Sequence, residues 1–117
     1  MNIQQWKVIT TERFNTWFFE QDEATQDSVL VSLGLLKSEG PLLSRPYADT
    51  IKGSQYNNMK ELRIQHQGKP IRAFFAFDPL RQAIVLCAGD KSNDKKFYDR
   101  MILIADAEFT YYLNSLE

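Results

Sequence analysis

The sequence predicts an α+β fold: an N-terminal strand and an αα-hairpin, then a three-stranded antiparallel meander and a C-terminal helix packed on the sheet. Residues 62–88 hold three short apolar runs separated by two turn signals, Gln67-Gly68 and Asp78-Pro79. Short loops between such runs favour antiparallel neighbours. Before and after this region, apolar residues recur at the three- and four-residue spacing of helices. We expect one domain over residues 1–117, because no linker or repeat interrupts the pattern.

The first elements are a strand and a helix. Gln5–Ile9 alternates in the manner of a short strand. Thr10-Thr11 can then cap a helix, because a threonine oxygen at this position accepts a free backbone amide. Three aromatic residues recur at helical spacing on this helix and are expected to join the core: Phe14, Trp17 and Phe18.

A second helix is predicted from an Asp22 cap to about Glu39. Gly40-Pro41 ends it, because glycine tolerates the closing conformation and proline cannot continue a helix. Its expected buried stripe is Val29, Leu33 and Leu36, widened by Leu30. The following segment, Pro41–Asn58, is predicted to be an irregular loop, which either faces a partner or packs on the sheet.

The meander is predicted from the runs Leu62–His66, Ile71–Phe77 and Ala83–Ala88. Strand alternation gives it one apolar face and one polar face. A solvent-exposed polar face that carries Arg63, Arg72 and Lys91 would suit an anion. The alternative for each arginine is an exposed sheet charge or a salt bridge to Glu61 or Asp90.

The last helix is predicted to begin with an Asp94 cap and to run from Lys95 towards Leu116. A broad apolar stripe on it should pack on the sheet: Phe97, Met101, Ile102, Ala105, Phe109 and Tyr112.

Composition indicates a cytoplasmic, soluble protein with no membrane span, since no apolar run approaches the required length. The single cysteine, Cys87, lies in an apolar run and is expected to be a small buried residue. The net charge of −1 argues against a uniformly basic nucleic-acid binder. However, residues 60–100 hold nine Lys or Arg against five Asp or Glu, so positive charge is concentrated on the meander.

Several motifs resemble the RelE/ParE toxin superfamily, and within it the phage-derived, HigB-type branch. They occur in family order: Arg45-Pro46-Tyr47, Asp49–Ser54, Met59–His66, Ile71–Pro79, and Gly89-Asp90-Lys91 followed by Phe97-Tyr98. Residues 1–44 match only in the order of elements. The resemblance implies a RelE-like fold. It also implies a type II toxin that cleaves mRNA, at the ribosome, and arrests growth until a cognate helix-turn-helix antitoxin binds it. The alternatives are a ParE-like inhibitor of DNA gyrase and an inactive toxin-fold binding module.

Metal-free RNA cleavage, which the resemblance implies, needs no cofactor. It requires a base for the 2′-hydroxyl, positive charge at the phosphorane and a proton for the leaving oxygen. Arg63, Arg72 and Lys91 suit charge stabilisation. His66 is either the base or an exposed turn residue, and Tyr98 either stacks on a base, donates a proton or packs in the core. The lysines expected to contact RNA are Lys60, Lys69, Lys95 and Lys96.

Overall fold

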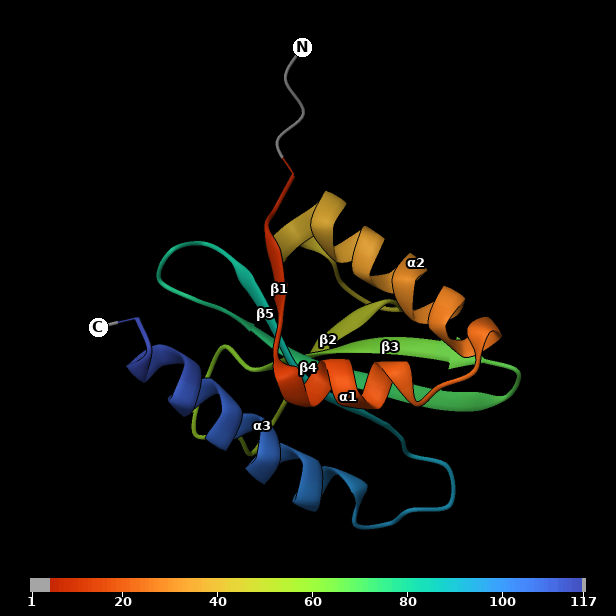
Figure 1. Cartoon of the computed structure of the whole chain (residues 1–117). Coiled ribbons are helices and arrows are strands. Elements are labelled where there is room, and N and C mark those ends of the chain that lie inside the picture. Colours follow the sequence, from red (N-terminus) through yellow and green to blue (C-terminus); the bar gives the residue numbers. More distant parts are fainter. Residues whose placement is uncertain (1–4, 117) are drawn as a thin grey trace.

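The computed structural model describes residues 5–116; residues 1–4 and 117 of the expected domain lie outside this range. One five-stranded sheet has α1 and α2 on one face and α3 on the other (Figure 1). No helix in the described range is long and apolar enough to cross a membrane. The elements are β1 (Val8–Thr10), α1 (Glu12–Phe19), α2 (Glu23–Glu39), η1 (Gly40–Leu42), β2 (Ala48–Thr50), β3 (Lys60–His66), β4 (Lys69–Phe77), β5 (Ala83–Asp90) and α3 (Phe97–Asn114).

The strand order is β1-β5-β4-β3-β2, so the predicted meander forms the centre of the sheet. β1 pairs in parallel with β5, and β2 pairs antiparallel with β3. The prediction of an irregular loop over Pro41–Asn58 was therefore wrong at two places, η1 and β2. β2 has three residues, too few to show alternation, and its pairing with β3 defines it.

The two N-terminal helices begin where their capping residues predict. The Thr11 hydroxyl accepts a hydrogen bond from the Phe14 amide (3.1 Å), and the Asp22 carboxylate accepts one from the Thr25 amide (2.8 Å). Val29 of α2 is fully buried, as expected. Leu30 is 53% exposed, so the widening of the buried stripe to this residue was wrong. The sheet covers only the side of α2 that carries Val29, and Leu30 points past it.

The C-terminal helix begins two residues later than predicted, and its N-cap is Lys96 rather than Asp94. The Asp94 carboxylate accepts hydrogen bonds from the Lys96 amide (3.1 Å) and from Arg100 Nη2 (2.8 Å). Asp94 therefore stabilises the turn before α3 and does not cap the helix itself.

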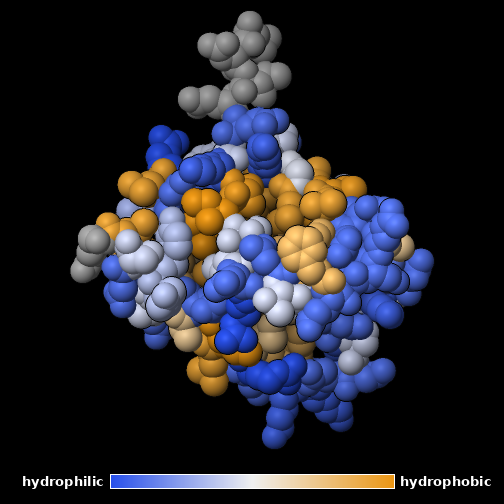
Figure 2. Space-filling view, in the orientation of Figure 1, coloured by the Kyte–Doolittle hydropathy of each residue, from blue (hydrophilic) through white to orange (hydrophobic). Residues whose placement is uncertain are grey.

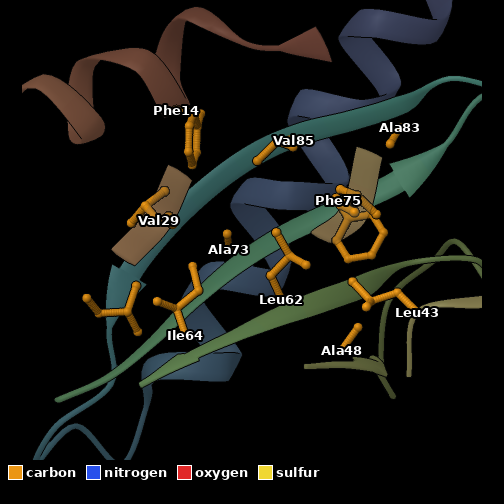
Figure 3. Packing of buried hydrophobic residues seen from close by; sticks show 13 residues of the cluster. Phe14, Val29, Leu43, Ala48, Leu62, Ile64, Ala73, Phe75, Ala83 and Val85 are labelled. Atoms are coloured by element: carbon orange, nitrogen blue, oxygen red, sulfur yellow. The ribbon is translucent and has the colours of Figure 1, made fainter. Parts of the chain in front are cut away.

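Two hydrophobic clusters lie on opposite faces of the sheet, because adjacent strand residues point to opposite sides. Phe75 packs with Phe14 and Val29 beneath α1 and α2 (Figure 3). Phe74 packs on the other face, with its ring centroid 6.1 Å from that of Phe97 in α3. The two clusters exclude water from both faces of the central strands.

A β-bulge in β5 increases the number of side chains on the α3 face. Phe74 lies opposite Cys87 and Phe75 lies opposite Val85, which leaves Leu86 as the extra residue. Leu86 and Cys87 consequently both join the α3 cluster. The expectation that Cys87 is buried is confirmed, and burial raises the pKa of its thiol to about 12.

Asp78 closes the β4–β5 turn and joins it to α3. Its carboxylate accepts hydrogen bonds from the Tyr112 hydroxyl (2.7 Å), the Gln82 amide (2.8 Å) and the Leu80 amide (3.0 Å). Burial acts to raise the pKa of Asp78, but the hydrogen bonds from Tyr112 and Gln82 outweigh burial and hold this pKa below its ordinary value.

We expect Asp78→Asn to reduce the free energy of unfolding at pH 7 by about 1–3 kcal/mol, the usual contribution of hydrogen bonds to a buried charge. Because the folded pKa is lowered, the stabilisation is present above the unfolded pKa of about 3.9 and is lost as the pH falls through the folded pKa. Urea denaturation at pH 7 and at pH 3 should therefore show a smaller difference between variant and wild type at pH 3. An equal difference at both pH values would contradict this role.

Candidate functional site

Two arginines face each other across the centre of the sheet. In the β3–β4 register Arg63 pairs with Arg72, so both side chains point to the same face, the α3 side. Like charges directly opposite one another destabilise a sheet unless a counter-charge lies between them. Glu61 precedes Arg63 by two residues and therefore points to the same face. The strand pattern alone thus places one carboxylate beside two guanidinium groups.

The carboxylate of Glu61 is the centre of this group. It accepts a hydrogen bond from Arg63 Nη1 (3.0 Å) and another from the Tyr98 hydroxyl (2.7 Å). Arg72 Nε lies 3.7 Å from the same carboxylate. We call these four residues the Glu61 cluster: Glu61, Arg63, Arg72 and Tyr98. The salt bridge to Glu61, one of the contacts expected for the two arginines, is therefore observed for both.

Burial within the Glu61 cluster differs from the expected solvent-exposed face. Arg72 is only 4% exposed, whereas the side chain of Arg63 is 25% exposed. The expectation of a solvent-exposed Arg72 was wrong, because the first turn of α3 brings Phe97 and Tyr98 over β4, beside Phe74. Arg72 Nη1 donates to the Ile71 carbonyl (3.0 Å), and its Nε is buried without a hydrogen-bond partner among residues 5–116. Arg63 therefore provides the accessible guanidinium and Arg72 a buried one.

Tyr98 is partly exposed and lies between the buried Glu61 carboxylate and the surface. Burial, followed by the hydrogen bond to Glu61, raises the pKa of its hydroxyl above the ordinary value. The Lys91 ammonium lies 5.5 Å from the centroid of the Tyr98 ring, within cation–π range. Lys91, Arg63 and Tyr98 thus form the outer part of the site.

The structure separates the remaining predicted residues into two groups. Lys95 and Lys96 are exposed in the loop immediately before Tyr98. His66 lies on the opposite face of β3, where its Nδ1 is 2.7 Å from the hydroxyl of Ser28 in α2. Lys60 also lies away from the cluster, with its ammonium 5.8 Å from the centroid of the Phe77 ring, and Lys69 is exposed beside the β3–β4 turn. His66, Lys60 and Lys69 are therefore not brought together with the two arginines.

Glu61 is the site residue that sequence reasoning missed, since it was considered only as an ion-pair partner. The available signal was the strand period, which places Glu61 and Arg63 on one face. The hydrogen bond between Glu61 and Tyr98 could not be predicted, because Tyr98 lies 37 residues further along the chain.

Comparisons with known proteins identify relatives of this chain. The family model "Phage derived protein Gp49-like (DUF891)" matches residues 16–110. The candidate toxin HigB3 of Mycobacterium tuberculosis is 45% identical over 109 residues, which cover 92% of this chain and 94% of HigB3. The candidate toxin HigB2 of the same organism is 43% identical over 108 residues, which cover 91% of this chain but only 54% of HigB2. The chain thus spans about half the length of HigB2.

The fold has a solved counterpart. A double-arginine mutant of the E. coli toxin RelE in the free state aligns with a TM-score of 0.60, at 9% identity, over 83% of this chain and 95% of RelE. At this identity the likeness concerns the fold, and it confirms the predicted RelE-like architecture. The family match covers most of the chain, and with the relatives it confirms the predicted relationship to HigB-type proteins. The chain belongs to the Gp49-like family of phage-derived proteins and is related to HigB-type proteins.

Proposed function

We propose that this protein is the toxin of a type II toxin-antitoxin system and that it cleaves mRNA without a metal ion, at the ribosome in the cytoplasm. The names of its HigB relatives support the toxin assignment, and the fold of RelE supports it independently. The observation that carries the ribonuclease assignment is the Glu61 cluster, where two arginines and a tyrosine hydroxyl converge on one carboxylate.

The scissile phosphate is proposed to bind at the outer part of the site. Arg63 can grip two phosphate oxygens, because its guanidinium presents paired donors. Lys91 adds an ammonium beside the Tyr98 ring. Lys95 and Lys96, exposed in the adjoining loop, contact the neighbouring phosphates. Arg72 lies buried below this surface and stabilises the negative charge of the phosphate electrostatically. Because water is excluded around Arg72, this interaction is weakly screened.

The proposed chemistry uses Tyr98 and Glu61 as a proton relay. The Tyr98 oxygen takes the proton of the RNA 2′-hydroxyl while its own proton passes to the Glu61 carboxylate, 2.7 Å away. The 2′-oxygen then bonds to phosphorus, and the bond from phosphorus to the 5′-oxygen breaks. Lys91 gives a proton to that leaving oxygen. The products are a 2′,3′-cyclic phosphate and a 5′-hydroxyl, and the negative charge that develops on the phosphorane lies beside Arg63 and Arg72.

The proposed partner is a cognate antitoxin with a helix-turn-helix domain, which holds the toxin inactive. We expect the product of the neighbouring open reading frame to co-purify with this chain and to relieve growth arrest.

The relay is tested with Tyr98→Phe, which keeps the ring and removes the hydroxyl. We expect it to lower the rate of RNA cleavage about 100-fold or more, the usual contribution of a positioned acid or base, and to abolish growth arrest on induction. Tyr111→Phe, on an α3 residue that is 77% exposed, is the matched control and should behave as wild type.

The readout is primer extension on cellular transcripts after induction. New 5′ ends inside translated codons are expected for the wild type and for Tyr111→Phe. Intact transcripts together with accumulated gyrase–DNA breaks would overturn the ribonuclease assignment in favour of gyrase inhibition. Full cleavage by Tyr98→Phe would overturn the relay alone.

A further inference from the structure

A groove runs between α1 and α3 on the surface. One cavity of about 510 Å³ lies where α1, β5 and α3 meet, and a second of about 400 Å³ lies beside β1, the start of α1 and the end of α3. Glu12 lines both cavities, so they are neighbours. We call the two together the α1–α3 groove. In Figure 2, hydrophobic and strongly hydrophilic side chains lie next to each other in the region between α1 and α3.

The floor of the α1–α3 groove is apolar and its rim is acidic. Trp17, Met101 and Ile104 are the larger apolar side chains of the first cavity. The charged lining consists of three glutamates and one arginine: Glu12, Glu20, Glu108 and Arg13. Arg13 Nε lies 3.4 Å from Glu108 Oε1, so that pair is neutral. Glu12 and Glu20 form no ion pair within residues 5–116, which leaves a net charge of −2 on the rim.

We propose that the α1–α3 groove is the docking site for an amphipathic helix of a protein partner, with lysine or arginine on both sides of an apolar stripe. A groove between two helices accepts the apolar face of a third, and basic side chains on that helix would meet Glu12 and Glu20. Under the proposed function, on which this inference rests, the helix belongs to the antitoxin.

The charge of the rim selects against other occupants. RNA is repelled, because Glu12 and Glu20 would face its phosphates. A second copy of the chain, bound through the same groove about a two-fold axis, would bring the acidic rim against itself. A basic protein segment is the occupant whose charge is complementary.

The groove and the Glu61 cluster use different sides of α3. Met101 lines the groove, whereas Tyr98, one turn earlier, points to Glu61 on β3. Loss of docking should therefore be separable from loss of toxicity. Substitutions on the groove rim are expected to leave RNA cleavage intact while preventing neutralisation by the partner.

The test compares two variants with the same change in charge. Glu12→Gln/Glu20→Lys alters the rim, and Asp27→Asn/Glu39→Lys alters exposed positions of α2 that do not line the groove. The probe is the purified product of the neighbouring open reading frame, titrated against each variant by calorimetry, together with co-expression in a growth assay. We expect at least a tenfold rise in Kd for the rim variant, with growth arrest that the partner no longer relieves. The α2 variant should bind within about twofold of wild type.

The outcomes separate this inference from the function on which it rests. Equal binding and equal neutralisation of wild type and rim variant would overturn the groove proposal and leave the toxin assignment intact. Failure of the wild type to bind the probe would overturn both. Thermal unfolding of the rim variant, expected within a few degrees of wild type because both residues are exposed, excludes misfolding as the cause of a loss.

Discussion

Arg72→Ala is expected to abolish growth arrest and also to reduce the free energy of unfolding by about 3 kcal/mol. The loss of activity follows from removal of the fixed positive charge beneath the proposed phosphate site. The loss of stability follows because Glu61 has a side chain only 5% exposed and would keep its carboxylate with fewer compensating charges. Growth after induction and urea denaturation of the purified chain measure the two effects.

A double variant separates the two effects. Replacing the ion pair with uncharged side chains of similar size, as in Glu61→Gln/Arg72→Met, usually costs little stability, because both charges are removed from a buried place together. We expect its free energy of unfolding to lie within about 1 kcal/mol of wild type, with growth arrest still lost. A stable double variant that arrests growth would exclude the Glu61 cluster as the active site.

The control for Arg72 is an arginine with a comparable partner on the surface. Arg45 Nη2 lies 2.7 Å from Asp49 Oδ2, and its side chain is 67% exposed. Because water screens such pairs, Arg45→Ala should cost no more than about 1 kcal/mol and should leave growth arrest unchanged. A fully toxic, folded Arg72→Ala would remove Arg72 from the proposed mechanism.

Gly40→Ala is expected to reduce the free energy of unfolding by about 2–4 kcal/mol, as the sum of backbone strain and overpacking. Gly40 ends α2 with φ +56° and ψ −134°, a conformation that side chains other than glycine's disfavour. A Cβ at this position would lie 2.2 Å from Trp6 Nε1. Trp6 cannot move away freely, since its amide donates to the Lys37 carbonyl (2.8 Å) and its ring packs on Phe77.

Gly34→Ala is the matched control within the same helix. Beyond the adjacent backbone of α2, no atom of residues 5–116 lies within 4 Å of the position that a Cβ would occupy at Gly34, which has helical geometry. Alanine there should raise the free energy of unfolding by up to about 1 kcal/mol, because it reduces the freedom of the unfolded chain. Urea denaturation should therefore show shifts of opposite sign for the two variants. Wild-type stability of Gly40→Ala would contradict the close approach of Trp6.

Local chemistry made most of the secondary structure predictable. The Thr11 and Asp22 caps depend on hydrogen bonds between a side chain and an amide three residues away, so they can be read directly. The turns of the meander are likewise set by neighbouring residues. The α3 cap was predicted wrongly, because the amide that Asp94 binds, that of Lys96, lies in the turn before the helix. β2 was missed, since only its pairing with β3 defines it.

The α+β class, the meander and the grouping of Arg63, Arg72 and Tyr98 in one stretch of the chain could be predicted from the sequence. Three further features depend on the packing of the elements: Arg72 is buried, Glu61 links both arginines to Tyr98, and His66 faces α2. The physical reason is the same in each case. Strand period assigns a side chain to a face, but which helix covers that face, and what it brings there, depends on contacts between residues distant in the chain.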